Sequence, residues 1–224
     1  MDPLKNPIIL FPLPSTVFYP GTQLPLHIFE PRYRKMVENA TDTDSLIGIV
    51  LLKPGWNSNY FGRPPVEEIG CAGKINFCKR FPDGRFNIIL QGLSRFRILE
   101  ESEGNPFRLA KVDFLKPLND HSLQTDSAEI GRNLIFQYQE LLESMPLKKD
   151  NRPLPKFQDC ETVGQAMDQI AYYLDWNIKQ KQAFLEERNV QSQLVYIQTE
   201  IELKSQILRV SSKFKKNKID PRLN

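Results

Sequence analysis

The hydrophobic pattern of this chain changes period near residue 118, and this change constrains its fold more than any other sequence feature. Before it, apolar residues alternate with polar ones or form short runs separated by proline and glycine, as in strands joined by turns. After it, apolar residues recur at spacings of three and four, as on one face of an amphipathic helix. We therefore expect an α+β protein with a β-rich part over residues 1–118 and a helical part over residues 119–224.

The β-rich part is expected to hold five or six strands and one short helix. Residues 46–52 form an apolar run without alternation, which predicts a strand covered on both faces. Pro31 suits the first position of the helix, where its missing N–H costs nothing. Residues 82–84 (Pro-Asp-Gly) predict a tight turn, and residues 92–94 a second one with Gly92 at positive φ. Such strands favour a small barrel that is closed or nearly closed.

The helical part is expected to contain four helices. Their apolar faces lie near residues 126–145, 159–174 and 179–187, and along a last helix that begins at Asn189. Asp126 is expected to cap the first of them. In the β-rich part, Arg95 is expected to be structural, with its stem packed and its head paired with a carboxylate or carbonyls.

No pattern in the sequence indicates a catalytic, cofactor or metal site. The phosphate-binding pattern G-x-x-x-x-G-K-[ST] and the nucleophile pattern G-x-S-x-G are both absent. His27 and His121 have no evident partners, and the three cysteines do not have metal-ligand spacing, so free thiols are expected. We therefore expect no enzyme, no cofactor and no metal.

The location of the protein is predicted from two further absences. No stretch approaches the roughly 20 apolar residues that cross a bilayer. The N-terminal residues carry no basic segment of the kind that begins a signal peptide. These observations predict a cytoplasmic protein without a membrane partner.

Two groups of residues are candidates for binding. Aromatic side chains beside prolines make flat apolar surface that suits a peptide, and here they are Phe18, Tyr19, Phe29 and Tyr33. The alternative for Phe29 and Tyr33 is that they belong to the core. Basic side chains gather at Arg32, Arg34 and Lys35 and again near the C-terminus at Lys213, Lys215 and Lys216. The alternative for the C-terminal group is the solvated end of a helix, where Lys and Arg are favoured.

The order of short motifs resembles the N-terminal domain of Lon proteases. The similar segments are residues 7–13 (PIILFPL), 17–21 (VFYPG), 24–33 (LPLHIFEPRY), 68–75 (EIGCAGKI) and 92–98 (GLSRFRI). The resemblance implies a PUA-like, β-rich pseudo-barrel followed by a C-terminal helical bundle. It also implies recognition of substrate polypeptides, while the chemistry of Lon lies in ATPase and Ser-Lys protease domains. Because this chain carries no pattern of either, it is expected to be a stand-alone, non-catalytic member.

Two functions are therefore in question. The first is a polypeptide-binding or adaptor module, and the alternative is an RNA-binding protein, because PUA-like relatives bind RNA. The net charge of +3 is small, and residues 1–118 carry 15 basic and 12 acidic side chains, which disfavours RNA. A catalytic role ranks last. The residues leave the partner, the oligomeric state and any cooperation with a full-length Lon protease open.

Overall fold

The computed structural model describes residues 7–102, 106–144 and 155–217, with side chains up to residue 211. The chain forms two compact units. One comprises residues up to Leu118 together with Leu174–Arg188, and the other comprises Asn119–Tyr173 and the residues from Asn189 onward. The helix within Leu174–Arg188 therefore belongs with the strands, whereas the sequence assigned it to the helical part. We call the two units the barrel unit and the helical unit.

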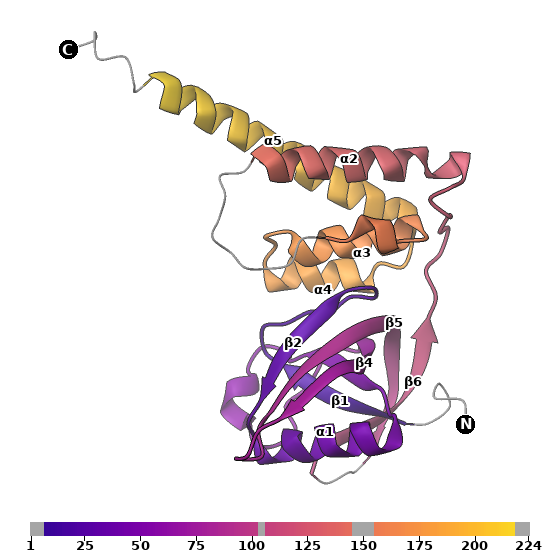
Figure 1. The fold of residues 1–224 in the computed structure, drawn as a ribbon, viewed down its shortest axis with the longest axis vertical. Helices are drawn as coiled ribbons and strands as arrows, with labels where there is room; N and C mark the ends of the chain where they lie inside the picture. The colour runs from indigo at the N-terminus through magenta and orange to yellow at the C-terminus, as the bar shows by residue number, and fades with distance from the viewer. Residues whose placement is uncertain (1–6, 103–105, 145–154, 218–224) are drawn as a thin grey trace, which may run out of the picture. The chain divides into compact units, whose positions relative to one another are not determined.

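The barrel unit is a six-stranded sheet that closes on itself (Figure 1). Its order is β2-β5-β4-β3-β1-β6, and β6 pairs back onto β5. β1 and β3 pair in parallel, with Leu10 opposite Gly48, and the other pairings are antiparallel. The strands are β1 (Ile8–Leu13), β2 (Gln23–Ile28), β3 (Ile47–Leu51), β4 (Ile69–Arg80), β5 (Phe86–Ser102) and β6 (Arg108–Leu115).

The core of the barrel is apolar. Every residue of β3 is buried, as its unbroken apolar run predicts. Leu10, Val50 and Phe96 meet in one cluster from three different strands. This burial from all sides is the hydrophobic term that holds the closed sheet together.

β5 is one long strand where the sequence predicted two strands and a turn. Gly92 lies inside it and does not have a positive φ, so the predicted second turn is wrong. Gly92 is needed for another reason: a Cβ there would lie 2.1 Å from the backbone oxygen of Tyr19. The backbone of Gly92 also bonds to Gly21 and Thr22, at 3.0 and 2.9 Å. Close backbone approach, not turn geometry, therefore accounts for this glycine.

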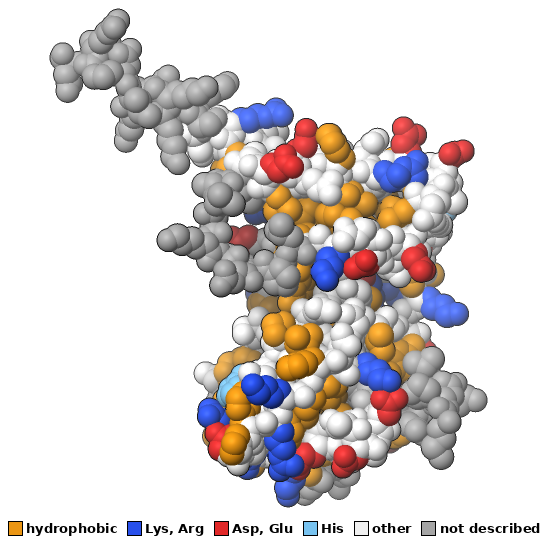
Figure 2. Space-filling model, in the orientation of Figure 1, with side chains coloured by type: hydrophobic (Ala, Val, Ile, Leu, Met, Phe, Trp, Pro, Cys, Tyr) orange, Lys and Arg blue, Asp and Glu red, His pale blue; other side chains and the backbone are white. Residues whose placement is uncertain are grey.

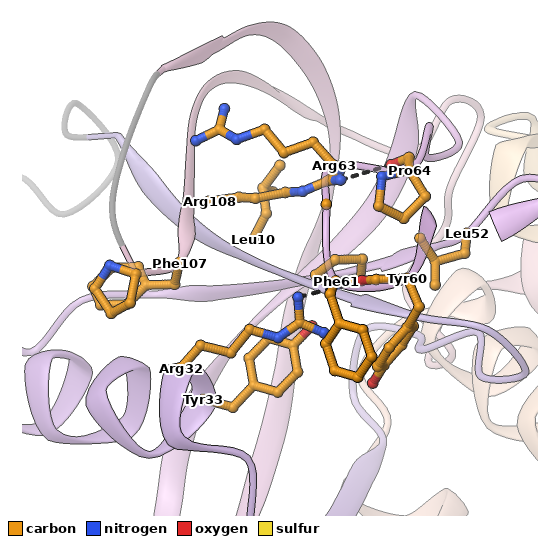
Figure 3. Close-up of a pocket in the computed structure, with 13 residues that line it drawn as sticks. Leu10, Arg32, Tyr33, Leu52, Tyr60, Phe61, Arg63, Pro64, Phe107 and Arg108 are labelled. Carbon is orange, nitrogen blue, oxygen red and sulfur yellow. Dashed lines mark hydrogen bonds between the residues drawn. The ribbon is translucent and has the colours of Figure 1, made fainter. Parts of the chain in front are cut away.

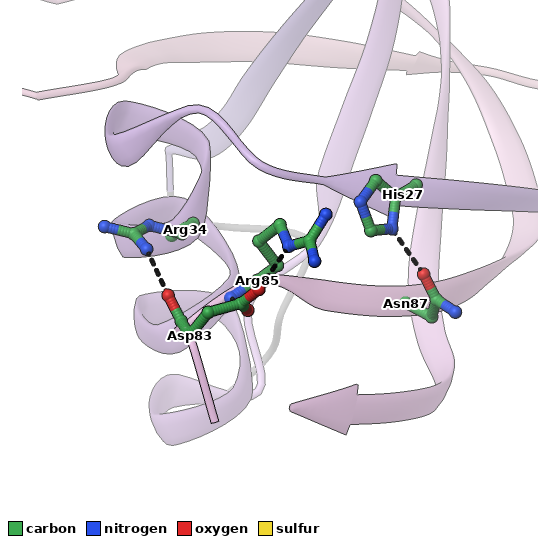
Figure 4. A network of polar contacts seen from close by, with 5 residues as sticks. All are labelled: His27, Arg34, Asp83, Arg85 and Asn87. Atoms are coloured by element: carbon green, nitrogen blue, oxygen red, sulfur yellow. Dashed lines mark hydrogen bonds and ion pairs between the residues drawn. The ribbon is translucent and has the colours of Figure 1, made fainter. Parts of the chain in front are cut away.

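Helix α1 (Pro31–Thr43) lies against one side of the barrel, and Pro31 occupies its first turn as predicted. The turn between β4 and β5 has Gly84 at a φ of 81°, which confirms the predicted tight turn. Arg34 of α1 donates to the backbone oxygen of Asp83 in that turn at 3.0 Å, and Arg85 pairs with the Asp83 carboxylate (Figure 4). Helix and turn are thus joined by polar contacts on the surface.

Helix α4 (Ile178–Glu186) is tied to the barrel by side chains that reach backbone groups. The hydroxyl of Tyr19 donates to the oxygen of Lys181 at 2.8 Å. Gln182 donates from its amide to the oxygen of Ile69 at 3.0 Å. Arg95, which is buried, donates from Nε to the oxygen of Leu185 at 2.9 Å, which confirms its structural role. The helix itself begins with a capping box formed by Asn177 and Gln180.

The helical unit consists of α2 (Glu129–Ser144), α3 (Val163–Tyr173) and α5 (Val190–Asn217), which pack against one another in pairs. Asp126 lies in a 3-10 turn (Asp126–Ala128) that runs into α2, so it is not the predicted cap. Asp120 accepts hydrogen bonds from the backbone N–H of His121 and of Gly164, at 2.9 and 2.8 Å. The Asp120 carboxylate thereby accepts a hydrogen bond from a backbone N–H in the first turn of α3, although it lies far from α3 in sequence.

Within the described ranges, no helix is long and apolar enough to span a membrane. The cysteines are free thiols, as expected: Cys71 is buried, Cys78 is exposed and Cys160 is half-buried.

Candidate functional site

A pocket of about 190 Å³ opens in the barrel unit where three segments meet (Figure 3). These segments are β1 with the start of α1, the loop between β3 and β4, and the residues that lead into β6. The pocket lining combines aromatic, proline and arginine side chains: Leu10, Pro12, Arg32, Tyr33, Leu52, Tyr60, Phe61, Gly62, Arg63, Pro64, Pro106, Phe107 and Arg108. In Figure 3, Arg63 and Arg108 lie on one side of it, and Arg32 and Tyr33 on the other.

Arg32 is held in a fixed orientation at this pocket. Its guanidinium lies between the rings of Tyr33 and Tyr60, 4.5 and 4.9 Å from their centroids. Its Nε pairs with Glu30 Oε2 at 3.1 Å, and the other oxygen of Glu30 accepts the hydroxyl of Tyr60 at 2.5 Å. A guanidinium stacked and ion-paired in this way loses little entropy when it binds a ligand.

The loop between β3 and β4 presents the aromatic wall of the pocket. Its ends are joined by backbone bonds, including Lys53 N–H to the oxygen of Pro65 at 2.9 Å. Between them, the rings of Trp56, Tyr60 and Phe61 form a chain of edge contacts, 5.6 and 5.2 Å between centroids. Phe61 at its end is 88% exposed. A large apolar side chain held at the surface by an anchored loop is typical of a binding surface.

Arg108 forms the opposite, buried wall. It stands at the start of β6, where its register partner is Leu10 of β1. Its Nη2 donates to the oxygen of Pro64 at 2.7 Å, and its Nη1 lies 3.7 Å from Glu101. Burial lowers the pKa of Arg108, Glu101 raises it, and the positive charges of Arg63 and Arg32 lower it again.

The two tyrosines of the pocket stay neutral at ordinary pH. Burial raises the pKa of Tyr33 to about 12. Burial also raises the pKa of Tyr60, and its hydrogen bond to Glu30 raises it further. Around this site the described residues hold aromatic, apolar and cationic groups, and they contain no cluster of three or more His, Cys, Asp or Glu that could hold a metal. The arrangement is suited to binding an apolar and an anionic group together.

The four aromatic residues predicted to bind polypeptide lie in different places. Phe18 and Tyr19 are fully buried, which corrects the expectation that they form surface. Tyr33 is nearly buried, yet it lines the pocket, so it belongs both to the core and to the site. Phe29 is 61% exposed and stacks on His27, away from the pocket lining, with centroids 6.2 Å apart.

The predicted basic residues also separate. Arg32 lines the pocket, Arg34 is bound to the β4–β5 turn, and Lys35 is exposed on α1. Lys213, Lys215 and Lys216 lie in α5, and their side chains lie outside the described part of the structure. On the face shown in Figure 2, basic and acidic side chains are interspersed over the barrel unit.

Sequence reasoning missed most of the pocket. The sequence analysis singles out no residue of the loop over residues 54–65, which includes Tyr60, Phe61 and Arg63. A signal is present there, because the loop places aromatic and arginine residues together among glycines and prolines. Phe107 and Arg108 gave no such signal, because they fit the alternation of a strand.

Comparison with known proteins gives consistent similarities. The family model described as ATP-dependent protease La (LON) substrate-binding domain matches residues 7–202. The chain is 28% identical to a Lon protease from Dictyoglomus thermophilum over 222 residues, covering 94% of this chain and 26% of that protein. It is 26% identical to Lon protease 2 of Myxococcus xanthus, covering 91% of this chain and 24% of that one. It therefore spans about a quarter of the length of these relatives.

Among solved structures, the fold is similar to a crystal structure of a Lon N-terminal domain protein from Xanthomonas campestris. The TM-score is 0.60 at 22% identity, with 87% of this chain and 98% of that chain covered. This similarity confirms the expected fold class, a β-rich barrel combined with helices.

Proposed function

This chain belongs to the family of LON substrate-binding domains, and we propose that it binds unfolded or degron-bearing polypeptide segments at the pocket of the barrel unit. In this proposal the chain contributes binding alone, and a bound segment can be presented to another protein, as by an adaptor. The observation that carries the proposal is Phe61, a large apolar side chain held 88% exposed at the rim of the pocket by an anchored loop.

The lining of the pocket supports a polypeptide as the ligand. Its walls combine apolar rings and prolines with hydrogen-bonding guanidinium groups, a mixture that suits a peptide side chain beside its backbone.

The alternative of RNA has less support from the basic residues. Arg34 already donates to the backbone of the β4–β5 turn, and Arg32 is ion-paired with Glu30. Binding to RNA would depend steeply on salt, because it releases counterions from the phosphates. RNA is therefore used as a competitor in the test.

The experiment is a fluorescence anisotropy titration of a labelled, permanently unfolded polypeptide with the chain. We expect saturable binding that survives moderate salt and resists a single-stranded RNA of similar length. Phe61→Ser is expected to weaken binding roughly tenfold, the size of a modest hot spot.

Two other exposed phenylalanines serve as matched controls, Phe29 in the barrel unit and Phe136 on α2. Phe29→Ser and Phe136→Ser are expected to leave the affinity unchanged. Displacement of the polypeptide by RNA, or equal losses in the three variants, would overturn the proposal.

A further inference from the structure

Three arginines line the pocket, and two of them have guanidinium N–H groups without a hydrogen-bond acceptor among the described residues. The three are Arg32, Arg63 and Arg108, and the carboxylates of Glu30 and Glu101 pair with Arg32 and Arg108. Nη1 of Arg63 donates to the backbone oxygen of Ser102 at 3.3 Å. Arginine stays protonated in proteins, so these groups remain donors at all ordinary pH values.

The charge of Arg108 is incompletely compensated among the described residues. Its side chain is only 9% exposed, and its carboxylate partner Glu101 lies 3.7 Å from Nη1, beyond hydrogen-bond distance. Its hydrogen bond among the described residues is the one from Nη2 to Pro64. A buried charge normally requires full pairing, because the loss of its hydration is otherwise not compensated. An anion in the pocket would supply the missing acceptor.

Arg32 presents a second set of donors. Its hydrogen bonds to the described residues use Nε, to Glu30, and Nη1, to the backbone oxygen of Tyr60 at 3.4 Å. Its Nη2 has no such bond within the described residues. Tyr33 and Tyr60 fix the plane of the guanidinium, so the remaining N–H groups of Arg32 are already oriented before a ligand binds. A planar guanidinium edge matches a carboxylate, which it can bind with two parallel hydrogen bonds.

The size and the walls of the pocket limit the ligand. Its volume of about 190 Å³ lies below the roughly 300–1,000 Å³ of pockets for drug-sized ligands, so it suits one side chain or one chain end. Phe61, Phe107 and Leu52 make part of the wall apolar. A small anion with an apolar group beside it fits a pocket of this size with a partly apolar wall.

We propose that the pocket binds a carboxylate of a polypeptide, flanked by an apolar side chain that packs against Phe61 and Phe107. This inference rests on the proposed polypeptide-binding function and names the chemical class of segment that is preferred. The carboxylate comes either from an acidic side chain within the segment or from its C-terminus.

The test uses the whole chain and four labelled short peptides with leucine beside the central position. The first has a central glutamate and an amidated C-terminus, and the second has glutamine in its place. The third has glutamine and a free C-terminal carboxylate. The fourth has glutamate but serine in place of leucine. We expect the first or the third peptide to bind about tenfold more tightly than the second, consistent with one charge-assisted hydrogen-bonded pair.

The protein variants are Arg32→Gln, Arg63→Gln and, as a control, Arg34→Gln in the same turn of α1 as Arg32. Arg32→Gln and Arg63→Gln are expected to reduce the preference for the carboxylate to within about twofold. Arg34→Gln is expected to retain it. Arg63 is exposed, so its variant tests the inference even if the others disturb folding.

The outcomes separate this inference from the proposed function. Equal affinity for all four peptides, weakened by Phe61→Ser, would overturn the carboxylate site and keep polypeptide binding. Stronger competition by inorganic phosphate than by free glutamate would also overturn it in favour of a phosphate site. No binding of any peptide would overturn both. A free C-terminus that binds as well as, or better than, the internal glutamate assigns the source to the chain end.

Discussion

The barrel unit and the helical unit hold themselves together in different ways. In the barrel unit, polar side chains reach backbone groups far away in the sequence, as Tyr19 does to Lys181 and Arg95 to Leu185. In the helical unit, α2, α3 and α5 present apolar faces to one another, and Asp120 adds a polar contact to the start of α3. The attachment of α4 to the apolar barrel therefore depends on exact placement of individual polar groups, whereas the packing of α2, α3 and α5 depends on repeated apolar contacts.

The largest expected effect comes from filling the space at a glycine in each unit. Gly92→Ala would place a Cβ 2.1 Å from the backbone oxygen of Tyr19, which cannot move without breaking the barrel. We expect a loss of about 3 kcal/mol or more. Gly131→Ala in α2 would meet the methyl groups of Val163 at 2.8 and 3.0 Å, and the gain in helix propensity offsets this clash in part, so we expect a loss of about 1 kcal/mol. Urea unfolding of both variants measures the difference, and equal losses would contradict it.

The next largest effect is expected at the hydrogen bond that links β5 to α4. Arg95→Met keeps an apolar stem but removes the donor to the oxygen of Leu185. We expect a loss of about 2 kcal/mol, because a buried carbonyl is left unsatisfied. Hydrogen exchange in α4 should also accelerate. Arg97→Met, at an exposed position on the same strand, is the control and should change neither quantity. Unchanged exchange in α4 of Arg95→Met would show that this bond does not hold the helix.

In the helical unit, the matching test removes Asp120. Asp120→Ala takes the acceptor from two backbone N–H groups, those of His121 and Gly164. We expect a loss of about 1 kcal/mol, as for a helix cap. The exposed Asp159 provides the control, and Asp159→Ala should stay close to wild type in thermal unfolding. A loss as large as that of Arg95→Met would remove the contrast between the units.

The last expected effect, which is absent at neutral pH, is a dependence on alkaline pH from Cys160. Burial, with the nearby charges of Asp159 and Asp168, raises the pKa of this thiol to about 11 from an ordinary value of 9.0. The unfolded thiol loses its proton first, so the free energy of unfolding falls as pH rises from about 9 to about 11. Across this window the urea midpoint of the wild type should fall more steeply with pH than the midpoint of Cys160→Ser. A difference between the two urea midpoints that does not change with pH would contradict the raised pKa of Cys160.

The sequence predicted the strands, the helices and the fold class because periodicity and turn residues act locally. It missed the continuity of β5, because Gly92 in a strand and Gly92 in a turn have the same sequence neighbours. It also assigned α4 to the helical unit, since the bonds of Tyr19 and Arg95 to α4 span 162 and 90 positions. Of the pocket lining, Arg32 had been a candidate only for a basic surface and Tyr33 only for polypeptide binding. Arg108 was not a candidate, because only the fold brings it to the loop between β3 and β4.

The most direct test of the central claim is hydrogen exchange of the chain with and without a saturating unfolded polypeptide. The account predicts slower exchange in residues 54–65 and 106–108, around the pocket of the barrel unit. It predicts unchanged exchange in α2 and α5. Protection confined to the helices of the helical unit, with none around the pocket, would contradict it.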